Sequence, residues 1–143
     1  MNTMSSTEEA VRAWAEGLYP TEAGVELLIR AGQIYDGAPW VIADGDRAWI
    51  DVDRLIEHTG GLSGGERRLV DVAASLLSPE RPVDLNDAIP GMDRAGVDLV
   101  LAAIAHASGS HEHSGFTFQD GQPAGIVRLS SLHEWPTRDT NST

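Results

Sequence analysis

The chain has 143 residues, 41% of them hydrophobic, which suits one compact domain with a single core. It carries 10 basic and 22 acidic residues, for a formal net charge of −12, and it contains no lysine. A surface this acidic repels phosphate backbones, so the composition argues against direct binding of nucleic acid. No apolar run approaches the ~20 residues needed to cross a bilayer, which argues against insertion into a membrane.

The cysteine content and the first residues together indicate a compartment. The chain has no cysteine, and its opening MNTMSSTEEAV lacks the basic start and the apolar stretch of a secretory signal. We therefore expect a cytoplasmic protein without disulfides.

Two helices are predicted at the start of the chain. Thr7 is a capping residue ahead of acidic and apolar residues at helical spacing, which predicts a helix over about 8–18. Pro20 stands where the first turn of a helix favours proline, and Gly32 provides a stop, so a second helix is expected between them.

A hairpin and a short helix are predicted next. Apolar runs on both sides of Asp44 and Gly45 predict a hairpin over 40–50. Asp51 then opens a short helix that ends before Gly60.

The middle of the chain predicts two longer helices. Ser63 and Glu66 have the spacing of a capping box, which predicts a helix through residue 77. Prolines end that helix, and a turn of helix is expected within 83–89. Asp93 caps a helix over 94–107 that is apolar around much of its circumference, which predicts a position at the centre of the domain.

A second hairpin is predicted near the end of the chain. Residues 108–114 have the composition of a loop, and apolar runs flank the turn at Asp120 and Gly121. The predicted fold is therefore α+β, a mostly helical single domain over 1–135 with two short hairpins. We expect that the hairpins could join into one small sheet against the helix 94–107, and that residues 136–143 form a flexible tail.

Residues 62–68, LSGGERR, resemble the signature motif of ATP-binding cassette ATPases. In register with that family, Asn86, Asp87 and Asp93 occupy the positions of the Walker B aspartate, the catalytic glutamate and the D-loop aspartate. A nucleotide site also needs a glycine-rich loop and a lysine, and the chain has neither ahead of residue 62. The capping box alone explains the same residues, which favours a structural role for them. The alternative is a nucleotide- or phosphate-binding helix start at Ser63, Gly64 and Gly65.

A longer pattern of short matches, from LSGGER at 62–67 through PVDL at 82–85 and GMD at 91–93 to Gly109, is similar to a group of small uncharacterised proteins of actinobacteria and their phages. The absence of lysine is typical of a genome rich in G and C. That resemblance implies ancestry and a mobile-element context, and it implies no activity.

Three histidines, His106, His111 and His113, lie close together in the sequence, so a surface metal site is conceivable there. Their spacing is not that of a structural zinc site and no HExxH occurs, so no metal is predicted.

The sequence also contains no Gly-x-Ser-x-Gly elbow, the motif of a serine nucleophile in many hydrolases. Carboxylate pairs such as Asp51 and Asp53 stand where helix starts favour acids.

The sequence therefore predicts no enzyme, no catalytic residues and no cofactor. We expect a non-enzymatic interaction module, an accessory or inhibitory factor whose acidic surface, mimicking nucleic acid, binds a basic protein. The alternatives are a small-ligand or nucleotide-binding protein that uses Ser63, and a self-assembling structural protein in which exposed Trp40, Trp49 or Trp135 forms the subunit contact.

Overall fold

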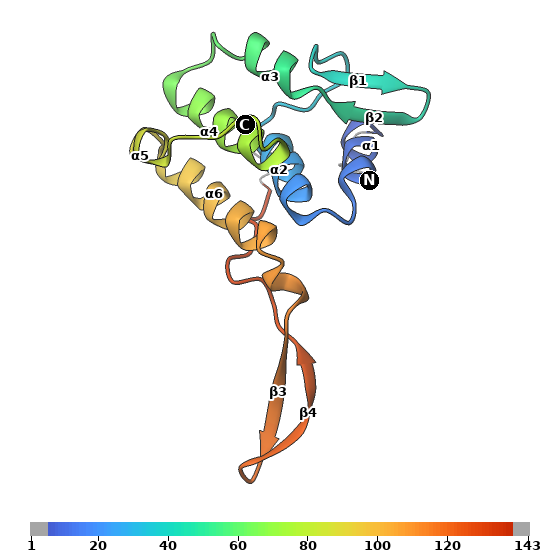
Figure 1. Ribbon diagram of the computed structural model, residues 1–143, viewed down its shortest axis with the longest axis vertical. Helices are drawn as coiled ribbons and strands as arrows, with labels where there is room; N and C mark the ends of the chain where they lie inside the picture. The colour runs from blue at the N-terminus through green and yellow to red at the C-terminus, as the bar shows by residue number, and fades with distance from the viewer. Residues whose placement is uncertain (1–5, 139–143) are drawn as a thin grey trace.

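The computed structural model describes residues 6–138, which form a helical body and one projecting hairpin (Figure 1). The elements, in order, are α1 (Ser6–Ala15), α2 (Tyr19–Arg30), β1 (Val41–Asp44), β2 (Arg47–Ile50), α3 (Val52–His58), α4 (Gly64–Leu77), α5 (Leu85–Ala88), α6 (Arg94–Ala107), the 3-10 helix η1 (Ser110–Glu112), β3 (Ser114–Gln119) and β4 (Gln122–Arg128). The predicted α+β fold of one mostly helical domain is confirmed. Among the described helices, none combines the length and the apolar composition that a membrane crossing needs.

Helix starts in the body follow the predicted caps. The Ser63 hydroxyl accepts from the amide of Glu66 at 3.3 Å, the first bond of a capping box, and donates to the Glu66 carboxylate at 2.9 Å. The carboxylates of Asp51 and Asp93 each accept from the backbone amide three residues on, at 3.1 and 2.8 Å. These side chains place the starts of α3, α4 and α6 where the sequence predicts them.

The first helix differs from its prediction. α1 begins at Ser6, so Thr7 lies inside the helix, and its hydroxyl donates to the carboxylate of Asp36 instead of capping α1. The helix ends at Ala15, earlier than predicted, and Gly17 turns the chain with a φ of 97° that only glycine adopts readily.

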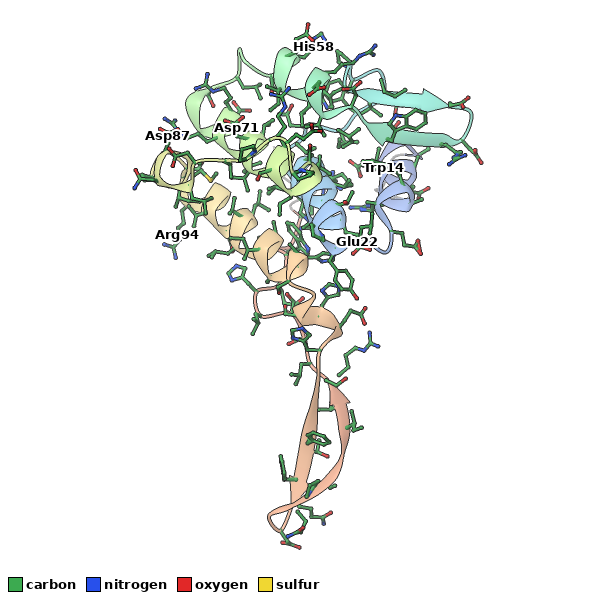
Figure 2. All side chains as sticks on the ribbon, viewed as in Figure 1. Trp14, Glu22, His58, Asp71, Asp87 and Arg94 are labelled. Carbon is green, nitrogen blue, oxygen red and sulfur yellow. The ribbon has the colours of Figure 1, made fainter. Side chains whose placement is uncertain are left out.

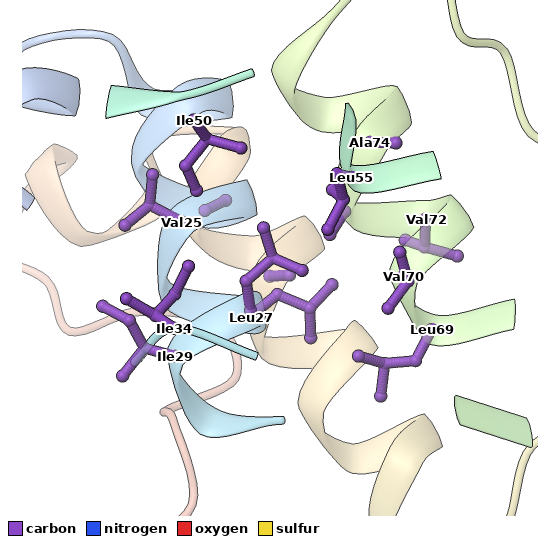
Figure 3. Close-up of a cluster of buried hydrophobic side chains, with 14 of the residues drawn as sticks. Val25, Leu27, Ile29, Ile34, Ile50, Leu55, Leu69, Val70, Val72 and Ala74 are labelled. Carbon is purple, nitrogen blue, oxygen red and sulfur yellow. The ribbon is translucent and has the colours of Figure 1, made fainter. Parts of the chain in front are cut away.

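The centre of the body is α2, which contacts α1, α4 and α6 (Figures 1 and 3). Gly24 allows the close approach of α4, because a Cβ there would lie 3.0 Å from the carbonyl oxygen of Ala73. The prediction that helix 94–107 is central is wrong, since α6 leaves Leu101 and Ile104 about half exposed on its outer side. The buried residues of α2 are Ala23, Gly24, Val25, Leu27, Leu28 and Ile29.

The two hairpins form separate two-stranded antiparallel sheets, so the expectation of one joined sheet against α6 is wrong. In the first hairpin, Val41 pairs with Ile50, and Gly45 and Asp46 form the tip, one residue later than predicted. β2 packs on α1 and buries Ala48 and Ile50. The second hairpin projects away from the body (Figure 1).

The chain after β4 returns to the body. Trp135 packs against the core, with the guanidinium of Arg30 5.1 Å from the centre of its ring. The carbonyl of Pro136 accepts from Arg30, and Arg138 makes two hydrogen bonds, 3.1 and 2.9 Å, to the buried carboxylate of Glu8. These contacts extend beyond the predicted boundary at residue 135, and residues 139–143 of the predicted tail lie outside the described residues.

Candidate functional site

The most unusual feature of the molecule is the hairpin Ser114–Arg128, called the arm below. Its strands pair from Ser114 with Arg128 to Gln119 with Gln122, and they contact chiefly each other. Asp120 and Gly121 form the tip with φ of 53° and 78°, the left-handed values that a tight hairpin turn requires. A two-stranded hairpin without further packing is only marginally stable in water, so the arm has the form of an element that another surface covers.

One face of the arm is apolar and open to solvent. Phe116 pairs with Ile126 across the strands, and Phe118 lies two residues along β3, so the three side chains share a face. They are 64%, 75% and 65% exposed, respectively. Large apolar side chains gathered on one exposed face mark interaction sites on proteins.

The opposite face of the arm and its strand edges are nearly free of obstacles to pairing. On that face Gly115 and Gly125 have no side chain, Thr117 has a small one, and Val127 pairs with Gly115, against which Leu129 packs. β3 contains neither charge nor proline, the devices that usually block the pairing of an edge strand with another chain. β4 carries Pro123 and a bulge, so β3 offers the better edge.

A cleft of about 480 Å³ opens in the body beside the base of the arm, lined by residues of α1, α2 and α6 and by Trp135 of the chain after β4. A partly buried ion network forms one wall: Glu26 accepts from Arg12 at 2.9 Å and from Arg30 at 2.8 Å. Burial alone would raise the pKa of Glu26, but these two arginines outweigh it and hold the pKa below its usual value. The other wall contains Trp135 and a histidine–carboxylate pair.

That pair belongs to a cluster of Glu22, His106 and His111. Nε2 of His106 lies 2.7 Å from Oε1 of Glu22, and the rings of His106 and His111 stack with centroids 4.2 Å apart. Figure 2 shows Glu22 on the side of the body from which the arm projects. The cluster therefore joins α2, the end of α6 and η1 at the point where the arm begins.

The electrostatics of Glu22 favour its charged form. Burial would raise its pKa, but hydrogen bonds from the His106 ring and from the amide of Gly17, at 2.8 Å, outweigh burial and lower the pKa. The carboxylate is thus ionised at neutral pH and faces two imidazoles.

The predicted ligand site at Ser63, Gly64 and Gly65 forms the start of α4. The Ser63 hydroxyl is engaged in the capping box, and the neighbouring cleft also contains the carboxylates of Glu66 and Asp93. Two carboxylates disfavour an anion there. Phosphate binding at Ser63 stays a prediction.

The positions that match the cassette family lie in a different local structure. Asn86 and Asp87 belong to α5, whose four residues follow a segment without strand in the described chain, and Asp93 caps α6. Asp87 pairs with Arg68 at 3.6 Å. These residues therefore do not lie at the carboxyl end of a buried strand, which is the position that a Walker B aspartate requires.

The tryptophans expected at a subunit contact are mostly engaged in the body. Trp40 is 4% exposed and its indole donates to the carbonyl of Gln33, and Trp135 packs on the core. The expectation that these two are exposed is wrong, and Trp49 is half-buried. The exposed apolar face lies on the arm instead.

Sequence reasoning found the histidines but not their partner. It grouped His113 with His106 and His111, whereas the structure leaves the His113 side chain exposed and brings Glu22 to the other two. Glu22 is 84 residues from His106, so no local pattern links them. The arm was predicted as a hairpin, but its projection was not.

No family model, no curated protein and no solved structure matches the chain. The resemblance to actinobacterial and phage proteins therefore stays a prediction.

Proposed function

We propose that the protein is a non-enzymatic protein-interaction module that associates with a second copy of itself through the arm. The observation that supports this most strongly is the exposed apolar face of Phe116, Phe118 and Ile126 on a hairpin that makes few other contacts. The cysteine-free composition fits an intracellular, reducing compartment as its place of action.

The distribution of charge supports a second copy as the occupant. Within the arm, Asp120 and Arg128 cancel, so the net charge of −12 lies outside it. Strands of this length extend about 20 Å, more than the screening length of roughly 8 Å in physiological salt. Two arms can therefore meet while the acidic bodies stay far enough apart to repel each other little.

The exposed apolar area sets an upper limit on the dimer contact. At ~150–250 Å² for each large apolar side chain, Phe116, Phe118 and Ile126 together expose on the order of 400 Å² on one face of the arm. Val127 pairs with Gly115 and belongs to the opposite face. Two such faces offer less than the ~1,000 Å² of a stable specific interface, so we expect a weak dimer that depends on protein concentration.

The geometry of the edge suggests how two copies meet. Antiparallel pairing of β3 with β3 of a second copy obeys two-fold symmetry and produces a four-stranded sheet. Such a sheet also places the two apolar faces side by side. Four strands with a shared apolar face are stable where a lone hairpin is marginal.

The basic partner predicted from the sequence remains a second candidate, supported by the net charge of −12. Salt distinguishes the two. A complex between the acidic surface and a basic protein weakens steeply with salt, whereas association through apolar arms that carry no net charge does not.

The test compares two variants that change the charge equally. Ile126→Lys places an ammonium on the apolar face of the arm, and Leu85→Lys places one on α5, where Leu85 is also more than half exposed. Light scattering coupled to size exclusion, over a concentration series, measures the mass of each protein. We expect a concentration-dependent dimer for the native protein and for Leu85→Lys, and a monomer for Ile126→Lys.

Circular dichroism of the variants provides the control for folding. A native protein that is monomeric up to millimolar concentration would exclude the second copy as the occupant. Equal loss of dimer in both variants would mean that the contact lies elsewhere on the body.

A further inference from the structure

We propose that Glu22, His106 and His111 form a binding site for one divalent transition-metal ion, for which Zn²⁺ is the best match. One potential ligand atom from each side chain lies within 4.8 Å of the other two. The three residues come from α2, α6 and η1, so the tertiary structure and not a local motif assembles the site.

An unmet hydrogen-bonding need in the cluster points to a missing partner. Nδ1 of His111 is buried and has no hydrogen-bond partner among the described residues. Buried polar atoms almost always have one. Two imidazoles that stack at 4.2 Å beside an ionised carboxylate would be held together by a cation that they share.

The walls of the cluster limit the freedom of the ligands. The ring of Tyr19 packs edge-on against His106 and His111, with centroids 6.3 and 5.0 Å apart. Gly109 turns the chain with a φ of 77°, and a Cβ there would lie 2.9 Å from the Tyr19 ring. The second carboxylate oxygen of Glu22 accepts from the Gly17 amide, the kind of outer contact that orients a metal ligand.

The donor set selects the class of metal. Two imidazole nitrogens and one carboxylate oxygen suit Zn²⁺ in tetrahedral coordination, whereas Mg²⁺ and Ca²⁺ prefer oxygen ligands. Glu22 and His106 also line the cleft of about 480 Å³, which leaves room for a water molecule as fourth ligand. The ion enters between His106 and Glu22, so their 2.7 Å contact opens to about 3.3 Å, the separation of two ligands at ~2 Å from zinc.

Binding would have a structural consequence for the arm. η1 joins α6 to β3, and a metal bond from His111 to α2 and α6 fixes η1 on the body. The ion would thereby hold the base of the arm in one orientation. This inference does not depend on the dimer, since all three ligands belong to one chain.

The experiment titrates the chelator-treated full-length protein with ZnCl₂ and with MgCl₂ by isothermal calorimetry, using the Ile126→Lys variant, which we expect to be monomeric, in parallel. We expect one Zn²⁺ per chain and no comparable binding of Mg²⁺. Glu22→Gln and His111→Ala should weaken Zn²⁺ binding at least about tenfold, the lower end of what the loss of even an outer partner costs.

His113→Ala is the matched control, because His113 is a histidine two residues from His111 with an exposed side chain. It should leave the affinity unchanged. Imidazole nitrogen shifts in NMR provide a second readout: His106 and His111 should move on addition of Zn²⁺, and His58 should not. Absence of stoichiometric binding, or equal weakening by His113→Ala, would overturn the proposal.

Discussion

The two hairpins of this protein arise from similar sequence patterns and have opposite surroundings. Both have an Asp-Gly pair at or beside the tip and apolar residues on each side. The hairpin β1–β2 lies against α1 and buries Ala48 and Ile50, whereas every residue of β4 in the arm is exposed. Local sequence patterns thus specify that a hairpin forms, whereas apolar residues elsewhere in the chain decide whether the hairpin is covered.

The largest expected difference between the two hairpins is in core packing. Ile50→Ala removes a side chain that is 4% exposed and should lower the free energy of unfolding by about 2–5 kcal/mol. Ile126→Ala removes the same atoms from the arm, where no cavity can form in the monomer, and should change it by less than about 0.5 kcal/mol. Urea denaturation at low protein concentration measures both. A large loss in Ile126→Ala under these conditions would show that the arm packs on the body of its own chain.

Close contacts of glycine offer a second comparison. Gly24→Ala forces a Cβ against Leu77 and the Ala73 carbonyl oxygen, and should cost about 1–3 kcal/mol of unfolding free energy. In the arm, Gly125→Ala meets only the Thr117 hydroxyl, at 3.3 Å, which can rotate away. Thermal unfolding should therefore separate these two variants clearly, and equal costs would contradict the tight contact between α2 and α4.

The fold was largely readable from the sequence because its helices are bounded by local chemistry. Asp51, Ser63 and Asp93 cap their helices through side-chain contacts three residues away, a range that a sequence pattern reveals. The central helix was not readable, because the burial of α2 depends on three partners that are distant in sequence. The same reason hid Glu22, whose role as a neighbour of His106 exists only in the folded chain.

Ion pairs give the third comparison, which appears in the pH dependence of stability. Glu26 has a pKa below the usual 4.5, so in acid the folded state binds fewer protons than the unfolded state. The contribution of Glu26 to the free energy of unfolding is therefore fully present above about pH 4.5 and is lost as the pH falls through the lowered pKa. Glu26→Gln should cost about 1–2 kcal/mol at neutral pH and flatten the loss of stability in acid.

Glu112→Gln is the control near the arm, since Glu112 pairs with an exposed Arg128 at 2.5 Å. Exposed pairs contribute little, so this variant should keep the native acid dependence. Denaturant unfolding between neutral and acidic pH measures both variants. A native acid profile in Glu26→Gln would mean that other carboxylates carry the dependence.

The smallest expected effect distinguishes the tips of the two hairpins. Asp120 adopts a φ of 53°, a left-handed value that asparagine tolerates better than aspartate in a tight turn ahead of glycine. Asp120→Asn should therefore stabilise the arm by a few tenths of a kcal/mol and slow amide exchange in β3 and β4 only. Asp46→Asn makes the same change of charge at the other tip, where φ of Asp46 is not positive, and should slow exchange in neither hairpin.

Slower exchange in both variants would attribute the effect to the lower net charge of the chain. Slower exchange in the arm alone, and only with Asp120→Asn, would show that the arm forms and opens as a unit separate from the body.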